Sequence, residues 1–153
     1  MSKQSAGILL YRKAHNHIEV LLVYPGGPYF TGKDAGNWTI PKGEFTEEEA
    51  PLQAAIREME EETGFTPEGT FVALNPIKQK SGKIVHCWAV ESDLDVTTIV
   101  SNTFELEWPP KSGRKKTYRE IDKAAWFTIT TAKEKINERQ IPLLEELEQI
   151  VHS

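Results

Sequence analysis

One segment of the sequence is bounded by a proline and a glycine, and this segment constrains the fold most. Pro51 suits the first position of a helix, where its missing N–H costs no hydrogen bond. Gly64 can adopt the left-handed conformation that ends a helix. A capping box formed by Thr46 and Glu49 is an alternative start, but it would place the proline inside the helix. We therefore predict a helix from Pro51 to Thr63.

The predicted helix carries a group of carboxylates on one side. At about 100° per residue, Glu58, Glu61 and Glu62 fall within an arc of about 100°. Arg57 lies at the edge of this arc and can pair with Glu61 at i,i+4. Clustered like charges near a helix C-terminus destabilise the helix, whereas carboxylate oxygens are the ligands that hard dications prefer. On the helix alone, a solvated charged face is the commoner interpretation. The apolar stripe beside these carboxylates consists of Leu52, Ala55, Ile56, Met59 and Thr63.

The remaining segments predict strands on both sides of this helix and helices at the C-terminus. A polar turn, residues 12–17, joins the first two strands, and a glycine-rich loop covers residues 25–41. The tail from Ala132 to Val151 predicts one or two helices interrupted near Pro142. The expected strands are Ala6–Tyr11, Ile18–Tyr24, Phe71–Ile77, Ile84–Glu91, Thr103–Trp108 and Ala124–Ile129.

Length and composition indicate an ordinary globular chain. The 153 residues, 39% of them hydrophobic, suit a single domain over residues 1–153. A net charge of −5 disfavours a nucleic-acid-binding protein. Cys87 is the single cysteine, so we expect a reducing, cytoplasmic setting. Residues 1–7 lack the features of a signal peptide, and no apolar run reaches the roughly 20 residues that span a membrane. We expect His15, His17 and His152 at the surface, and the sequence does not indicate an oligomeric state.

The segment from Gly43 to Phe65 resembles the Nudix box of the Nudix hydrolases. The box is a glycine, five free positions, a glutamate, seven free positions, and then Arg-Glu-apolar-x-Glu-Glu-x-Gly-apolar. Nine constrained positions at fixed spacing make this a specific resemblance. They are filled by Gly43, Glu49, Arg57, Glu58, Met59, Glu61, Glu62, Gly64 and Phe65.

This resemblance implies an α/β/α sandwich with a mixed β-sheet, and a hydrolase that cleaves a diphosphate bond. It implies that Glu58, Glu61 and Glu62 bind divalent metal, expected to be Mg²⁺ with Mn²⁺ as a substitute, and that the Gly43 carbonyl is a further ligand. Glu49 and Arg57 match positions that orient this cluster and are counted with the catalytic residues. Glu61 is our first choice of catalytic base, because Arg57 can orient it.

Two charged residues outside the box are further candidates. Lys42 directly precedes the box and can reach a substrate phosphate as a point charge, or it can be a solvated loop lysine. Glu120 precedes the strand that contains Trp126, where some Nudix enzymes place a carboxylate that reaches the metal. The alternative for Glu120 is a solvent-facing side chain.

Two segments, the loop from Gly26 to Gly36 and the basic turn at residues 111–116, are the candidates for substrate selection, because the box handles only the diphosphate and its metal. Trp38 and Tyr29, in or beside the first loop, can stack on a base, or they can pack beneath the loop. The basic turn at residues 111–116 can bind phosphate, or it can be an ordinary charged hairpin tip.

The expected substrate is a small nucleotide-like diphosphate, with a nucleoside triphosphate as the default. A dinucleoside polyphosphate is the alternative. The Trp38–Gly43 stretch resembles the approach to the box in diadenosine polyphosphate hydrolases, but residues 66–117 lack the tyrosine that these enzymes usually carry soon after the box. A Nudix module that binds a nucleotide without cleaving it remains a third alternative.

Overall fold

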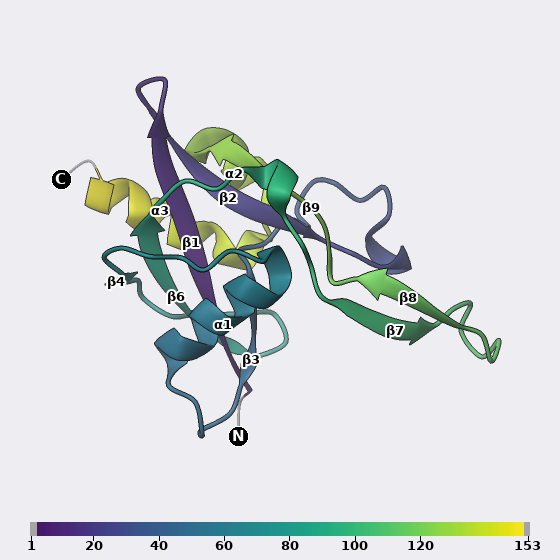
Figure 1. Cartoon of the computed structure of the whole chain (residues 1–153). Coiled ribbons are helices and arrows are strands. Elements are labelled where there is room, and N and C mark those ends of the chain that lie inside the picture. Colours follow the sequence, from purple (N-terminus) through teal and green to yellow (C-terminus); the bar gives the residue numbers. More distant parts are fainter. Residues whose placement is uncertain (1–2, 152–153) are drawn as a thin grey trace.

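A mixed sheet of seven strands forms the centre of the molecule (Figure 1). The computed structural model describes residues 3–151, so Met1, Ser2, His152 and Ser153, and with them the expectation for His152, lie outside it. The strand order is β4-β6-β1-β2-β9, with β3 paired to β1 and β5 paired to β6. The β1–β6 pair is parallel, and the other pairs are antiparallel. The strands are β1 (Gln4–Ala14), β2 (His17–Pro25), β3 (Lys42–Phe45), β4 (Val72–Ala73), β5 (Ile77–Lys78), β6 (Ile84–Glu91) and β9 (Ile121–Thr128).

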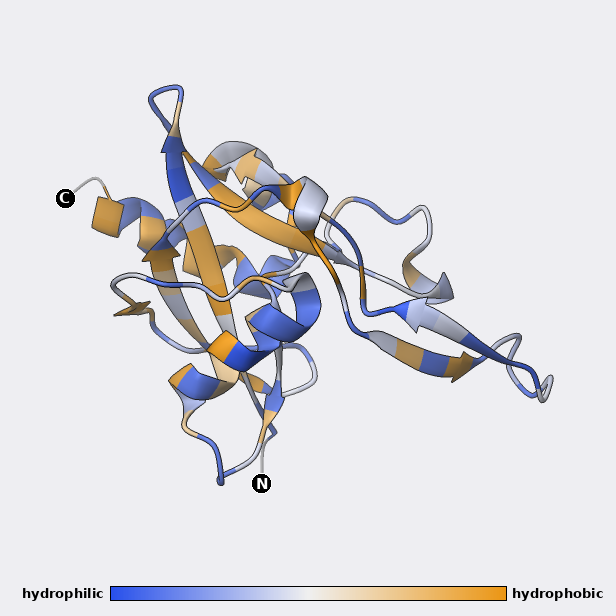
Figure 2. Cartoon of the chain, viewed as in Figure 1, coloured by the Kyte–Doolittle hydropathy of each residue, from blue (hydrophilic) through white to orange (hydrophobic). Residues whose placement is uncertain are grey.

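Helices cover both faces of this sheet and bury two separate cores. Side chains alternate between the faces of a strand, so Ile8 and Leu10 of β1 pack toward helix α1, and Leu9 packs on the other side. Figure 2 shows hydrophobic residues along the central strands and a more hydrophilic α1. The predicted α/β/α sandwich with a mixed sheet is confirmed. The helices are α1 (Pro51–Thr63) on one face and α2 (Ile129–Lys135) and α3 (Ile141–Val151) on the other, with short 3₁₀ turns η1 (Pro28–Phe30), η2 (Val96–Thr98) and η3 (Glu138–Gln140).

A two-stranded hairpin projects away from the sandwich (Figure 1). It consists of β7 (Thr103–Glu107) and β8 (Lys115–Arg119), which pair with each other but with no strand of the main sheet. We call residues 103–119 the arm. The basic turn predicted at residues 111–116 forms its tip and the start of β8.

Several sequence-based boundaries differ from the structure. The strand predicted over Phe71–Ile77 is two short pieces, β4 and β5, because Pro76 has no N–H to donate to the neighbouring strand. The C-terminal helices are interrupted at residues 136–140 rather than at Pro142, which lies in the first turn of α3, where proline is tolerated. Strands β3 and β8 were not predicted. His15 and His17 are exposed, as expected. Within residues 3–151, no helix is long and apolar enough to cross a membrane.

Candidate active site

Helix α1 has the predicted ends, but its buried face differs from the prediction. Pro51 opens the helix, and Gly64, at φ 79°, donates its backbone N–H to the Glu60 carbonyl at 2.8 Å. Glu58 and Glu62 are only 8% and 6% exposed, so they lie within the buried face rather than beside it. The buried arc is therefore rotated toward the carboxylates. Ala54, on the other side of Glu58, is also buried, whereas Ile56 at the far edge and Leu52 in the first turn are only partly buried.

Arg57 joins three carboxylates of the box. Its Nε and Nη2 donate to the two oxygens of Glu49 at 2.8 and 3.0 Å, which is the bidentate geometry that guanidinium groups favour. Its Nη1 donates to Glu58 at 2.9 Å and to Glu61 at 3.1 and 3.2 Å. The predicted Arg57–Glu61 pair is therefore present, and two further pairs accompany it. Hydrogen bonding to Arg57 lowers the pKa of Glu49.

Gly43 lies directly against the Glu58 carboxyl group. Strand β3 pairs with the start of β1, with Gly43 opposite Ala6, and this pairing brings the beginning of the box beside α1. A β-carbon at Gly43 would overlap the Glu58 carboxyl carbon and both of its oxygens. Only glycine leaves room for this carboxylate, which gives a physical reason for the first position of the box.

Burial and mutual repulsion change the acidity of this cluster. Burial, followed by the charges of Glu58 and Glu120, raises the pKa of Glu62 to about 9. Burial is also the main cause that raises the pKa of Glu58. Lys42 lies in β3 beside these groups, and its backbone forms a hydrogen bond to Glu62. Burial and the nearby Lys83 lower the pKa of the Lys42 side chain. Lys42 is therefore not an ordinary solvated loop lysine.

Glu120 belongs to the same cluster, although it lies at the junction of β8 and β9. Burial raises its pKa, and the charge of Glu61 contributes in the same direction. The Glu120 backbone N–H donates to the carbonyl of Asn102 at 2.8 Å, and the Asn102 N–H donates to the carbonyl of Glu61 at 2.9 Å. The structure therefore does not support a remote, solvent-facing Glu120.

The chemistry of this donor set fits a hard dication. Glu58, Glu61, Glu62 and Glu120 could supply oxygen ligands, and a bound cation would offset the cost of ionising Glu58 and Glu62, which are nearly buried. Arg57 provides part of the positive charge. Among the described residues, no three acidic, histidine or cysteine side chains converge into a ready-made metal cage.

The two predicted stacking residues have different environments. Trp38 is 4% exposed, lies in the core against Tyr24 and Phe127, and donates its indole N–H to Asp34 at 3.0 Å. This burial favours the packing alternative over stacking on a base. Tyr29 is 53% exposed and meets Trp108 of the arm edge-on, at 5.2 Å between ring centroids.

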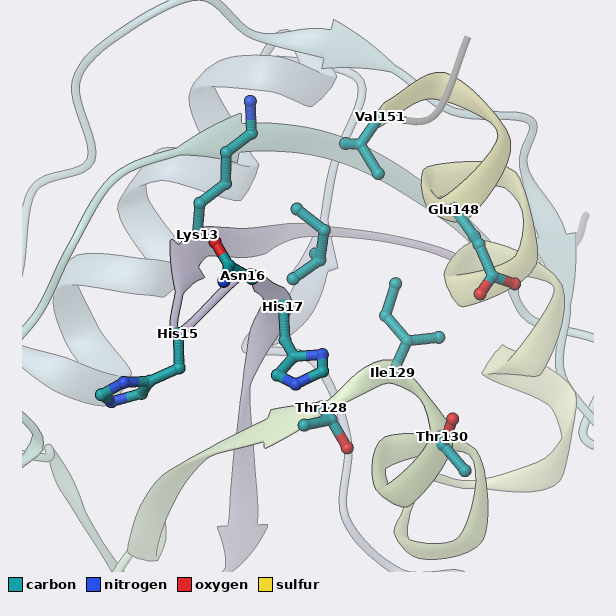
Figure 3. A pocket seen from close by; sticks show the side chains of 10 residues that line it. Lys13, His15, Asn16, His17, Thr128, Ile129, Thr130, Glu148 and Val151 are labelled. Carbon is teal, nitrogen blue, oxygen red and sulfur yellow. The ribbon is translucent and has the colours of Figure 1, made fainter.

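Two of the pockets outside the carboxylate cluster bear on the choice of site. One, of about 640 Å³, lies between the β1–β2 turn and helices α2 and α3, at the opposite end of β1 from Gly43 (Figure 3). His17, Thr128 and Ile129 lie around it, and none of the expected site residues lines it. The second, of about 400 Å³, lies between the 25–41 loop and β8–β9 and includes Tyr118 and Asp122, two residues to either side of Glu120.

Sequence reasoning missed two residues of this region. Lys83 forms an ion pair with Glu44 at 3.7 Å, and its charge contributes to the lowered pKa of Lys42. Asn102 connects Glu61 to Glu120 through its backbone. No local spacing could identify these residues, because β-sheet pairing and loop contacts bring them to the box.

Comparison with known proteins gives the family. The family model described as "NUDIX domain" matches residues 1–147, and the chain belongs to this family. A Caenorhabditis elegans protein named bis(5'-nucleosyl)-tetraphosphatase [asymmetrical] is 40% identical over 68 residues, which are 44% of this chain and 45% of that relative. The aligned stretch thus spans under half of the curated relative.

Solved structures share the fold along nearly the whole chain. A C. elegans Ap4A hydrolase binary complex is 24% identical with a TM-score of 0.67, over 97% of this chain and 98% of the other. The NUDIX domain of Shewanella oneidensis NrtR, complexed with ADP ribose, is 15% identical with a TM-score of 0.69, over 99% and 89% of the two chains.

Proposed function

We propose that this protein is a metal-dependent pyrophosphohydrolase that cleaves a diphosphate bond in a nucleotide-like substrate. The observation that carries the proposal is the group of four neighbouring carboxylates, two of them nearly buried, with Arg57 joining Glu49, Glu58 and Glu61. Glu58, Glu61, Glu62, Glu120 and the Gly43 carbonyl would hold Mg²⁺, or Mn²⁺ in its place. A small diphosphate is the expected partner.

The roles of the side chains follow from their surroundings. A bound dication would supply positive charge to the phosphate oxygens and lower the pKa of water. Glu61 is the proposed proton acceptor, because Arg57 restricts its orientation and it is more exposed than Glu58. Arg57 and Glu49 position the cluster. Lys42, beside Glu62, would neutralise a phosphate of the bound substrate.

We place a dinucleoside polyphosphate first among the substrates, ahead of the nucleoside triphosphate that the sequence alone favours. The name of the C. elegans relative and its 40% identity support this order. The absence of tyrosine from residues 66–117 supports the triphosphate, although Tyr118 lies just beyond that range and lines the pocket beside Glu120. Tyr29 remains a candidate for contact with a base, because its ring is exposed.

A hydrolysis assay with a substrate panel tests this proposal. The panel contains a dinucleoside tetraphosphate, nucleoside triphosphates and a nucleotide sugar, with products separated by chromatography. Activity should require Mg²⁺ or Mn²⁺ and disappear with a chelator. Turnover of every substrate by metal-free protein contradicts the metal-dependent mechanism. Binding of a nucleotide without any turnover supports the non-catalytic sensing module instead.

A further inference from the structure

Glu120 reaches the carboxylate cluster from a distant part of the sequence, so something must hold it there. Three backbone groups around it are bonded. Its N–H donates to the Asn102 carbonyl and its carbonyl accepts from Gly26, both at 2.8 Å. The next N–H, of Ile121, donates to the side-chain Oγ of Ser101 at 3.0 Å. Ser101 is the one side chain in this set of contacts.

The Ser101 hydroxyl makes two hydrogen bonds within this set of contacts. Its Oγ accepts from Ile121 and donates to the Asn102 carbonyl at 2.8 Å. The same carbonyl receives the Glu120 N–H. One hydroxyl thus links the Asn102 carbonyl to the peptide N–H that follows Glu120, and Ile121 itself is 5% exposed.

Residues 100–102 are also hydrogen-bonded to the C-terminal end of α1. Helix ends leave backbone carbonyls without partners inside the helix. The N–H groups of Asn102 and Val100 satisfy two of these, on Glu61 at 2.9 Å and Thr63 at 3.0 Å. Figure 1 shows this segment passing the C-terminal end of α1 before it enters β7. Residues 100–102 therefore cap the glutamate-bearing helix and clamp Glu120 at the same time.

The opposite side of Glu120 is equally confined. Gly26 donates to the Glu120 carbonyl, and a β-carbon at Gly26 would overlap the Arg119 carbonyl. These contacts restrict the Glu120 backbone from both sides. The Ser101 contact is the one among them that a side chain makes, so a mutation can remove it.

We propose that Ser101 is a positioning residue, which holds Glu120 at the carboxylate cluster through the Ile121 peptide and thereby fixes the metal site. The inference rests on the proposed function, because it needs Glu120 to act at the metal. Without the hydroxyl, the buried Ile121 N–H loses its acceptor, and the Glu120 peptide can rotate away from Glu61.

The test uses Ser101→Ala, with Ser101→Cys as a variant of similar shape and weaker hydrogen bonding. Loss of a residue that orients metal ligands typically weakens metal binding or activity by about 10-fold to 100-fold. We expect Ser101→Ala to lower kcat about 10-fold with little change in KM and to weaken Mn²⁺ binding, titrated without substrate, by a similar factor. Ser101→Cys should have kcat and Mn²⁺ affinity between those of Ser101→Ala and the unmodified protein. Ser101→Thr keeps the hydroxyl and should retain the values of the unmodified protein.

A double-mutant cycle separates positioning from simple destabilisation. Adding Ser101→Ala to Glu120→Gln should cause no further loss of kcat, because no carboxylate remains to be positioned. Thr128→Ala is the matched control, since the Thr128 hydroxyl also accepts a backbone N–H, from Thr131 at 3.4 Å, but caps α2. It should lower the melting temperature and leave kcat unchanged.

Each contrary result has a defined meaning. If Ser101→Ala has normal kcat and normal Mn²⁺ affinity while Glu120→Gln is impaired, Ser101 does not position Glu120. An equal loss in both backgrounds of the cycle shows that Ser101 has only a structural role. If Glu120→Gln is harmless, the inference fails, but metal-dependent hydrolysis by the unmodified protein would still support the proposed function.

Discussion

Helix α1 and the arm meet at residues 100–102, yet they carry opposite charges in opposite environments. Helix α1 holds Glu58 and Glu62 almost out of contact with solvent. The arm carries five cations and two carboxylates. Four of these cations lie at or next to its tip, and within residues 3–151 none of the four forms an ion pair: Lys111, Arg114, Lys115 and Lys116.

This difference shows where charge is costly to change. A buried carboxylate depends on a few defined partners, so removing one changes the energy of all of them. An exposed cation acts through a field that solvent and salt screen. Substitutions in α1 should therefore have large, salt-independent effects, and substitutions at the arm tip should have small, salt-dependent ones.

The largest effect is expected from Glu62→Gln. It removes a proposed metal ligand while keeping the size of the side chain, so kcat should fall by about 10²-fold or more. The melting temperature should not fall at neutral pH, because a pKa of about 9 leaves Glu62 protonated there, and the amide is neutral like the protonated acid. Glu60→Gln is the matched control, since Glu60 is exposed on the same helix. Equal activity of the two variants would contradict the expectation that the buried carboxylates of α1 are more sensitive to substitution than exposed charges.

The pH dependence of stability provides the second test. The pKa of Glu62 is about 9 in the folded chain, against 4.5 as its ordinary value, so the folded state binds the extra proton more tightly. Stability is then fully present below pH 4.5 and decreases as the pH rises toward 9. This single proton contributes at most ~1.4 kcal/mol per pH unit.

Urea unfolding of metal-free protein at several pH values measures this slope. The shifts of Glu58 and Glu120 have the same direction, so Glu62→Gln should reduce the slope without abolishing it. Since metal binding requires the deprotonated carboxylate, Mg²⁺ should release protons at pH 7, detectable by calorimetry in two buffers. An unchanged slope in Glu62→Gln would place the titrating group elsewhere.

Arg57→Lys should have an intermediate effect. A lysine keeps the charge but cannot bridge Glu49 in the bidentate manner and reach Glu58 and Glu61 together. We expect kcat to fall by about 10-fold to 100-fold, the scale seen when orienting residues around a metal are lost. Retention of full activity would mean that the charge alone, without the fork geometry, is sufficient.

The smallest effect is expected at the arm. Replacing both Lys115 and Lys116 with alanine should lower kcat/KM about threefold for a dinucleoside tetraphosphate and less for a nucleotide sugar, because the former has more negative charge. The gap should shrink at high salt. Lys13→Ala, an exposed lysine beside the β1–β2 turn, should change neither value. Equal losses on both substrates would make the tip a solvated hairpin end.

The sequence predicted the local features of α1 better than its surroundings. Pro51, Gly64 and the spacing of Arg57 and Glu61 are local signals, and the structure has the corresponding helix start, left-handed cap and ion pair. The burial of Glu62 was not predictable from helical periodicity, because polar residues are assigned to the outside unless a partner is known. That partner is β3, whose pairing with β1 spans distant residues.

The arm was harder to predict for a different reason. Strand β8 reads as a run of charged and polar residues, and most of them are exposed on both faces, so the period-two signal is absent. Its strand conformation comes from pairing with β7, with Leu106 opposite Lys116. Similarly, the position of Glu120 depends on backbone contacts with Asn102 and Gly26, and backbone contacts leave little trace in the sequence.

The hydrogen bond between the Glu120 N–H and the Asn102 carbonyl has a consequence for variation among sequences. Because the two ends of the arm are joined to each other and to α1, the chain between them closes a loop whose length does not enter the geometry of the carboxylates. We therefore expect insertions, deletions or exchange within residues 103–119 to leave the carboxylate cluster in place. If the arm selects the substrate, as the charge of its tip predicts, its replacement should change substrate preference and leave the proposed metal site unchanged.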